Sequence, residues 1–449
     1  MNEKLPMLSK EQLNEVGKEL LPAETLRGQL DLTDRGKPQP SIANVVRILK
    51  EDPFLVGAIG YNELSERINI VRDLGWMRED DVLDDTDMAY IRLYLEENYS
   101  IGYSKSIDPA IKIIANENRF HPIKDILNNL VWDGTSRLED MLTHFLGVEK
   151  TELTKEAIKL FMLGAVSRIF NPGCKFETFI CLVGDQGAGK STFLRFLAMN
   201  DKYFTDDLNR LDDEKIAAKL QGHWIIEMPE MMSILNSKRV EGIKKFISQQ
   251  SDIYRTPYEQ HPKNRKRQCV FGGTSNKMEI LPMDKSGNRR IIPIETHMDK
   301  AEVHILDNED ESREYILQVW AEIMEIYRSG EFSLTLPKHL QAELSKYQER
   351  FTPEDNDQEA IEYFLEKTSE KYVCVKMLAY EALGYSQYDQ IKKSDSNRIS
   401  EMIHHCPEWE AVGTRTVPKY GRVRAWRRKG DTSPDDDFIK VSEQMEIPF

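Results

Sequence analysis

One stretch decides the fold of this chain: FICLVGDQGAGKSTFLRFL, residues 179–197. The apolar run Phe179–Val183 predicts a buried strand, and the run from Lys190 to Leu197 predicts a helix. Between them, residues 184–191 fit G-x-x-x-x-G-K-[ST] at every position. The order strand, glycine-rich loop, helix predicts a phosphate-binding loop at the start of an α/β core.

This loop has the residue types that a nucleotide triphosphate requires. Glycines let backbone N–H groups turn inward around phosphate oxygens, at a helix N-terminus that favours anions. Lys190 is expected to reach the β- and γ-phosphates, and Ser191 to offer its hydroxyl to Mg²⁺. We therefore expect ATP and Mg²⁺ as ligands, against the alternative of a turn that merely needs glycine. The expected nucleotide-binding residues are Gly184, Asp185, Gln186, Gly187, Ala188, Gly189, Lys190, Ser191 and Thr192.

Composition indicates a globular protein of a reducing compartment. The 449 residues, 40% of them hydrophobic, are enough for two to four domains. Five cysteines are scattered without C-x-x-C spacing, which argues against a disulfide framework and a zinc ribbon. No segment has the length of apolar sequence that a membrane span or a secretion signal needs. We expect a cytoplasmic protein without a membrane partner.

Two acidic residues and one asparagine follow predicted strands and are expected to complete the catalytic site. A strand at 223–226 leads into Glu227 and Glu230, about 35 residues after the loop lysine, where ATPases of this type hold Mg²⁺ and polarise water. The alternative is a solvated strand end. Asn276 follows the predicted strand 268–274 and is expected to orient the attacking water. Arg289 and Arg290, on a Gly-Asn turn, are expected to stabilise transition-state charge.

Basic residues cluster in two places despite a net charge of −15. The segment 252–267 interleaves tyrosines with basic residues, and Arg255, Tyr258, Lys263 and Arg265 are expected to contact nucleic acid; a solvated hairpin is the alternative. Residues 414–429 contain seven basic residues and no acid. Helices at 376–383 and 394–405 followed by this basic hairpin have the order of a winged helix-turn-helix. Its expected DNA contacts are Arg422, Arg424, Arg427 and Arg428.

The remaining segments predict the domain organisation. An Asp-x-Asp pair at Asp85 and Asp87 is able to hold Mg²⁺ in a polymerase or primase, but these acids precede an amphipathic run and are typical of a helix cap. A short strand is expected at 54–61. We expect an N-terminal arm at 1–40, a mainly helical domain at 41–150, the ATPase core at 151–305, a helical connector at 306–355, a winged-helix-like domain at 356–430 and a disordered acidic tail at 431–449.

Taken together, these motifs resemble the virulence-associated protein E family, helicase-like ATPases of phages, plasmids and genomic islands related to superfamily 3 helicases. The resemblance runs from about residue 41 to about residue 300. Its marks are Phe120-His121-Pro122, Trp132-Asp133-Gly134, Asn171-Pro172-Gly173-Cys174-Lys175, the loop 184–191, Glu227-Met228-Pro229-Glu230, Tyr254-Arg255-Thr256-Pro257-Tyr258, Thr274-Ser275-Asn276 and Gly287-Asn288-Arg289-Arg290.

The resemblance implies a P-loop, AAA+-like ATPase core that assembles as a homo-oligomeric ring, with a hexamer favoured. It implies that Asn276 is a sensor and that Arg289 or Arg290 is an arginine finger. DNA, and a primase or replication initiator, are the implied partners. Two functions follow: an ATP-dependent DNA helicase or translocase in replication of a mobile element, or an initiator or regulatory ATPase that remodels complexes without unwinding.

Overall fold

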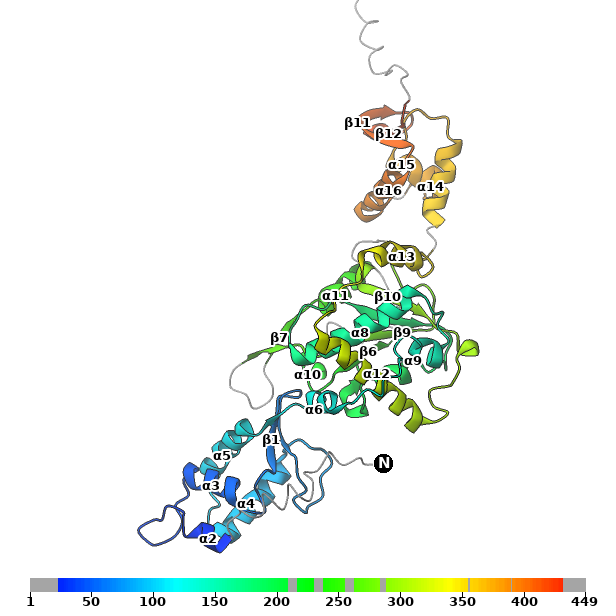
Figure 1. Cartoon of the computed structure of the whole chain (residues 1–449). Coiled ribbons are helices and arrows are strands. Elements are labelled where there is room, and N and C mark those ends of the chain that lie inside the picture. Colours follow the sequence, from blue (N-terminus) through cyan, green and yellow to red (C-terminus); the bar gives the residue numbers. More distant parts are fainter. Residues whose placement is uncertain are drawn as a thin grey trace, which may run out of the picture. The chain divides into compact units, whose positions relative to one another are not determined.

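The computed structural model describes residues 23–208, 216–229, 237–254, 262–282, 288–353, 356–388 and 390–430. Chain contacts divide the protein into two compact units, of which the first ends at Thr352 and the second begins at Pro353 (Figure 1). The predicted tail at 431–449 lies outside the described residues. The larger unit contains the phosphate-loop sequence.

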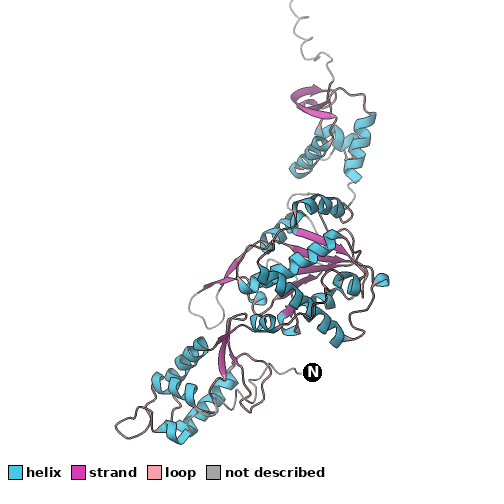
Figure 2. Cartoon of the chain, in the orientation of Figure 1, coloured by secondary structure: helices cyan, strands magenta, loops and turns pink. Residues whose placement is uncertain are grey.

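A five-stranded parallel sheet forms the centre of the larger unit (Figure 2). Its strand order is β10-β4-β9-β6-β5. In register, Ile180 of β4 pairs with Gly272 and Ile292. Parallel pairing brings the carboxyl ends of all five strands to one edge, so the segments that follow them meet there. The strands are β4 (Phe179–Val183), β5 (Phe204–Thr205), β6 (Ile225–Pro229), β9 (Val270–Ser275) and β10 (Ile291–Glu295).

Helices cover both faces of this sheet, which explains why β4 is buried along its whole length. Alternate residues point to opposite faces of a strand. Ile180 and Leu182 therefore pack in one core, with side chains from α8, α9, α12 and α13, whereas Phe179 and Cys181 pack in a second core with side chains from α11. The helices are α8 (Glu152–Phe170), α9 (Lys190–Leu197), α10 (Ile216–Leu220), α11 (Ser237–Ile247), α12 (Glu309–Ser329) and α13 (Lys338–Glu349).

Two tryptophans hold the long helix α12 against the first core. The rings of Trp224 and Trp320 lie 4.6 Å apart between centroids, and both side chains are fully buried. Each indole N–H finds a carbonyl: Trp320 donates to Leu197 at 3.0 Å and Trp224 donates to Ala165 at 3.0 Å. The pair therefore joins the helix that follows the glycine-rich loop to α12 and α8.

The N-terminal part of the same unit has a core of its own, built from helices around a small sheet of order β2-β1-β3. Leu26 and Leu30 are buried in this core, so the described part of the expected arm packs against the helices. Its elements are α2 (Ala23–Arg27), α3 (Ile42–Glu51), α4 (Asp85–Tyr99), α5 (Ser104–Glu117), β1 (Ile59–Asn62), β2 (Arg67–Ile70) and β3 (Arg119–Phe120).

Two sequence-based expectations for this part have different outcomes. The strand expected from residue 54 begins only at Ile59, because the Asp52 carboxylate accepts the backbone N–H groups of Phe54 at 2.8 Å and Leu55 at 3.1 Å and closes a turn. The helix-cap interpretation of the acidic run is confirmed: Asp84 and Asp87 form a capping box, and Asp87 also pairs with Arg78 at 2.8 Å.

Residues 122–148 belong to the core of the central sheet rather than to the N-terminal core. Ile123 of α6 (Pro122–Asn129) and Phe145 of α7 (Met141–Leu146) are both buried there. Between these helices, the Trp-Asp-Gly turn is closed by the Trp132 indole, which donates to the Thr135 carbonyl at 2.9 Å, and by two bonds from Arg137 to Asp133 at 2.8 and 2.7 Å. This motif is therefore structural.

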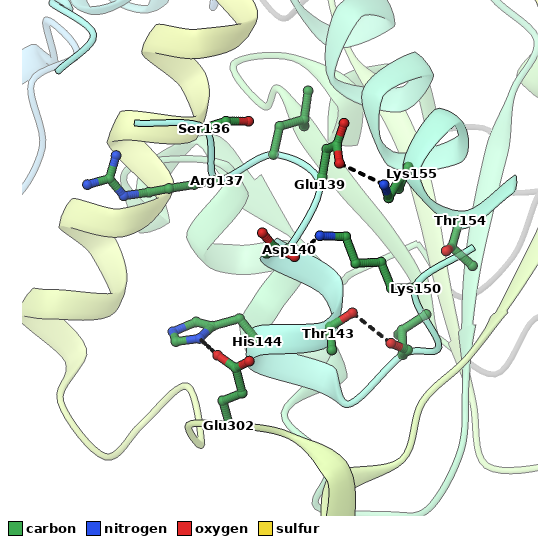
Figure 3. A network of polar contacts seen from close by, with 12 residues as sticks. Ser136, Arg137, Glu139, Asp140, Thr143, His144, Lys150, Thr154, Lys155 and Glu302 are labelled. Atoms are coloured by element: carbon green, nitrogen blue, oxygen red, sulfur yellow. Dashed lines mark hydrogen bonds and ion pairs between the residues drawn. The ribbon is translucent and has the colours of Figure 1, made fainter. Parts of the chain in front are cut away.

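The loop after this turn is fixed by one buried carboxylate of α12. Glu322, which is 8% exposed, accepts the Ser136 hydroxyl at 2.6 Å, the Arg137 backbone N–H at 2.8 Å and the Leu138 backbone N–H at 3.0 Å. Figure 3 shows this loop leading into further polar contacts of α7, including the ion pair between His144 and Glu302. Glu322 thus connects α12 to the segment that enters the core.

The described residues of the second unit form three helical segments and a long hairpin. Strand β12 also makes an isolated bridge from Trp426 to Val373, and the Trp426 side chain is fully buried. The hairpin packs on the helices of this unit through Trp409 and Val417, which are buried at the two ends of its first strand. The elements are α14 (Asn356–Lys367), α15 (Val375–Met377) with a π-helical turn (Leu378–Ala382), α16 (Lys393–His405), β11 (Trp409–Val417) and β12 (Gly421–Arg428).

Among the described helices, none combines the length and the apolar character that crossing a membrane requires.

Replacement of Glu322 tests its role as an anchor. We expect Glu322→Ala to lower the free energy of unfolding by about 2–4 kcal/mol, because two buried backbone N–H groups lose their acceptor. The matched control, Glu325→Ala, changes an exposed glutamate one turn along the same helix and should stay within about 0.5 kcal/mol of wild type. Chemical denaturation measures both; equal effects would contradict the anchoring role.

Candidate functional site

The glycine-rich loop lies at the carboxyl edge of the sheet, between β4 and α9. Gly187 and Gly189 have φ angles of 84° and 70°, which residues with a side chain adopt rarely. Gly184 is required for a different reason: a Cβ there would lie 2.2 Å from the Thr296 hydroxyl oxygen, at the end of β10. The glycines of the motif therefore serve both backbone conformation and close packing.

Lys190 is the first residue of α9 and is 6% exposed. Its ammonium donates to the carbonyl oxygens of Gly184 at 2.8 Å and Asp185 at 2.6 Å, and to the side-chain oxygen of Asn276 at 3.1 Å. Burial lowers the pKa of Lys190. The structure thus brings together the loop lysine and the asparagine that were expected to share a site.

Glu227 lies beside the start of the same helix. It is 1% exposed, and its Oε1 atom accepts the Ser191 hydroxyl at 2.7 Å and the Thr274 hydroxyl at 2.5 Å. Its Oε2 atom is buried and has no hydrogen-bond partner among the described residues. Burial raises the pKa of Glu227, while the two hydroxyl bonds act in the opposite direction.

The donor set around Glu227 fits Mg²⁺. This cation prefers oxygen ligands, keeps several waters and is usually held by one or two protein groups plus phosphate oxygens. Glu227 and Ser191 offer a carboxylate and a hydroxyl in direct contact, and the unpaired carboxylate oxygen is able to accept a cation as a ligand. Within the described parts of the chain no cluster of three His, Cys, Asp or Glu side chains forms a metal site by itself.

The strand that supplies Glu227 is longer than the sequence indicated. We expected the glutamate to follow a strand ending at residue 226, but it lies inside β6, paired with Gly272 of β9. The pairing turns its side chain toward Ser191 instead of into solvent. Glu230 lies outside the described residues. Sequence reasoning missed Asp206, which follows the Thr205–Ile226 pair of β5 and β6 and whose charge adds to the raised pKa of Glu227.

An open cleft of about 440 Å³ runs along the glycine-rich loop. One part of its wall comes from the ends of β6 and β9, and another part comes from two residues beyond β10, His304 and Leu306. Neither of these two residues had a sequence signal, because they belong to an irregular segment. The lining is completed by Gln186, Gly187, Ala188, Gly189, Lys190, Ser191, Thr192, Pro229, Thr274, Ser275 and Asn276.

The arginine pair lies at the opposite edge of the sheet. Arg289 and Arg290 form a 3₁₀ turn directly before β10, whose first residue pairs with Phe179 at the start of β4. Five residues of strand, roughly 16 Å, separate this edge from the loop. Arg290 pairs with Glu177 at 3.4 Å, whereas Arg289 is exposed and lines a second cleft of about 420 Å³. The structure therefore does not bring either arginine to Lys190 of the same chain.

The predicted loop at 252–258 begins as a strand. An antiparallel hairpin, β7 (Ser251–Tyr254) and β8 (Lys263–Lys266), extends from the main sheet, and Lys263 on it is exposed. Arg265 is 6% exposed and pairs with Glu66 of the N-terminal part, so it anchors the base of the hairpin. Arg255 and Tyr258 lie outside the described residues.

The four arginines of the C-terminal hairpin have different surroundings. Arg427 pairs with Glu410 at 3.2 Å, and Arg428 donates to the carbonyls of Leu365 at 2.7 Å and Glu366 at 2.9 Å. Arg422 and Arg424 are exposed nearer to the turn. Arg427 therefore joins the two strands of the hairpin, Arg428 attaches the hairpin to α14, and the last two arginines present charge to solvent.

Comparisons with known proteins identify a family. Residues 127–353 match the family model described as virulence-associated protein E-like domain. A search of curated proteins gave no match. Three solved apo structures of the NrS-1 C-terminal region are similar over 82% of this chain. The matches cover 96%, 95% and 96% of those chains, with sequence identities of 14%, 14% and 13% and TM-scores of 0.45, 0.46 and 0.47.

The buried carboxylate makes a prediction about pH. Because burial raises the pKa of Glu227, its charge lowers the stability of the folded protein above that raised pKa, and this effect vanishes below the ordinary value of 4.5. We expect Glu227→Gln, without Mg²⁺ or nucleotide, to unfold at higher denaturant concentration than wild type at pH 8 and to match it at pH 4. The amide oxygen still accepts both hydroxyls.

The control for this comparison is Glu325→Gln, which changes an exposed glutamate and should stay within about 0.5 kcal/mol of wild type at both pH values. If the Glu227→Gln protein is less stable than wild type at pH 8, the charged carboxylate does not lower the stability of the folded protein as expected. Burial would then not dominate its titration.

Proposed function

The chain belongs to the virulence-associated protein E-like family, and from the geometry of its loop we propose that it is an ATP hydrolase that moves along or unwinds DNA. The observation that carries the proposal is the convergence of Lys190, Ser191, Glu227 and Asn276 on one cleft. These residues come from a helix start and two strands. Their meeting supports phosphoryl transfer to water more than a turn that merely requires glycine.

Each of these groups has a part in hydrolysis. The Lys190 ammonium exchanges its loop carbonyls for β- and γ-phosphate oxygens, and backbone N–H groups of the loop surround the same phosphates. Ser191 and Glu227 hold Mg²⁺, which when bound neutralises charge on the phosphates. Asn276, already within 3.1 Å of the lysine, orients the attacking water, and Glu230 is proposed as its base.

The position of the arginine pair supports action between subunits. An arginine at the amino edge of the sheet is too far from its own loop, since the strand length of roughly 16 Å exceeds the reach of a side chain. Exposed Arg289 is able to enter the cleft of a neighbouring copy and stabilise charge on the transferred phosphoryl group. We therefore propose a ring-shaped homo-oligomer, with a hexamer favoured, and Arg289 rather than the paired Arg290 as the finger.

Two exposed basic surfaces are proposed to bind DNA. Lys263 lies on the β7–β8 hairpin, and Arg255 and Tyr258, which fall between β7 and β8 in the sequence, are proposed as further contacts. Arg422 and Arg424 lie on the C-terminal hairpin of a winged-helix-like unit. Phosphate contacts of this kind give sequence-independent affinity. We propose a role in replication of a phage or mobile element in the bacterial cytoplasm, with a primase or initiator as a further partner.

Loss of the loop lysine tests the central proposal. We expect Lys190→Ala to reduce ATP hydrolysis by about 10²-fold or more, because the phosphates lose a preorganised positive charge. Strand displacement on a forked DNA duplex should be lost with it. Phosphate release and gel-based unwinding assays measure the two activities.

Lys300→Ala, which changes an exposed lysine beyond β10, is the control and should retain both activities. Hydrolysis at the wild-type rate in Lys190→Ala would overturn the proposal. Hydrolysis by the wild type without strand displacement would favour a regulatory ATPase that remodels complexes.

A mixture of two inactive variants tests the interface. Lys190→Ala and Arg289→Ala should each be inactive, since each subunit then lacks either its own lysine or the arginine it gives to a neighbour. An equal mixture that co-assembles should regain roughly a quarter of wild-type turnover, because that share of interfaces pairs an intact loop with an intact arginine.

The same mixture with Arg290→Ala serves as the comparison, because Arg290 is held by Glu177 of its own chain. If Arg290→Ala is inactive by itself and regains activity in the mixture, whereas Arg289→Ala does not, Arg290 is the finger and the roles of the two arginines are exchanged. No recovery with either variant, in mixtures shown to co-assemble, would contradict a finger acting between subunits.

A further inference from the structure

The segment that follows β10, residues 296–307, lies against the glycine-rich loop and is called the bracket here. Its start is fixed to α7: the backbone N–H groups of Glu302 and Val303 donate to the His144 carbonyl at 3.0 and 3.1 Å, and the His144 ring pairs with the Glu302 carboxylate at 2.7 Å (Figure 3). The imidazole also stacks on Tyr315 of α12, with 4.8 Å between ring centroids. The segment is therefore attached to two helices of the core.

The far end of this segment is a closed turn. The backbone N–H of Asp307 donates to the His304 carbonyl at 2.8 Å, and the Leu306 N–H donates to Nδ1 of the His304 ring at 3.3 Å. A ring nitrogen that accepts a hydrogen bond carries no proton, so the neutral form has its proton on Nε2. The orientation and tautomer of the imidazole are thus set before any ligand binds.

Ile305 places this turn directly against the loop. Its side chain is fully buried, and its Cγ2 atom lies 3.0 Å from the position that a Cβ of Gly189 would occupy. On either side of it, His304 and Leu306 line the cleft. Leu306 is 48% exposed, so a large apolar side chain stands on the wall of the cleft.

The strand order gives the cleft two chemically different sides. β9 and β6, which carry Asn276 and Glu227, lie on one side of β4, and β10 lies on the other side with its bracket following it. The charged and metal-holding groups therefore gather on one side, where phosphates are stabilised. A nucleotide that extends away from this side reaches His304 and Leu306.

We propose that His304 and Leu306 form the platform on which the base of the nucleotide rests, an inference that depends on the proposed nucleotide site. The flat face of a base covers the exposed half of Leu306, and Nε2–H of His304 is a donor toward a ring nitrogen or carbonyl of the base. Bare triphosphate has no group for this platform. The platform gives the site preference for a nucleoside triphosphate over inorganic polyphosphate.

Calorimetric titration with two probes, ATP and inorganic tripolyphosphate, both with Mg²⁺, tests the platform. We expect Leu306→Ala to weaken ATP binding about fivefold, because covering the exposed half of a leucine contributes a factor of this size. His304→Ala should weaken ATP in the same direction. Both variants should bind tripolyphosphate as the wild type does.

Two controls separate the platform from the phosphate site. Leu93→Ala changes a leucine of similar exposure, 49%, on the N-terminal helix α4 and should leave both affinities unchanged. Lys190→Ala should weaken both probes. If Lys190→Ala weakens neither, or the wild type binds neither probe, the proposed nucleotide site itself is wrong and the platform with it.

If Lys190→Ala weakens both probes while Leu306→Ala and His304→Ala change neither, the platform alone is overturned. Equal losses of ATP and tripolyphosphate in the Leu306 and His304 variants would also overturn it, because the bracket would then only support the loop through Ile305. Loss of ATP affinity alone supports the platform.

Discussion

The pairing of β4 with β9 on one side and β10 on the other determines the position of every group in the cleft. β4 is buried on both faces, so neither its register nor its direction is free to change without moving two cores. Because all three strands run in parallel, the loop, Asn276 and the bracket beyond β10 all emerge at one edge. The same pairing sends Arg289 to the other edge.

Two buried carboxylates of this core accept hydrogen bonds from other elements of the chain. Glu227 receives hydroxyls from α9 and β9, and Glu322 receives backbone donors from the loop before α7. When a buried carboxylate loses one of its partners, the folded protein becomes less stable. A carboxylate with partners from separate elements therefore favours the one arrangement of those elements in which all the partners are present. One such carboxylate is used for structure and the other is available to a ligand.

Local sequence predicted the elements whose signal is contained within them. The apolar run of β4, the acidic cap before α4 and the glycine-rich loop are short-range patterns, and the structure has them where they were expected. The extension of β6 through Glu227 and the placement of His304 were not predictable in the same way. Both depend on pairing or packing with residues far along the chain, for which a single sequence contains no periodic signal.

The contacts of Lys190 have a consequence for the cycle of ligand exchange. The Lys190 ammonium donates to two loop carbonyls and to Asn276, and these three bonds stabilise the conformation of the glycine-rich loop. In the proposed function, a phosphate chain would replace these bonds, so part of the attraction it gains would be offset by the bonds that are lost. In the proposed cycle, release of the product would let the same three bonds form again, so the loop would not have to refold between turnovers.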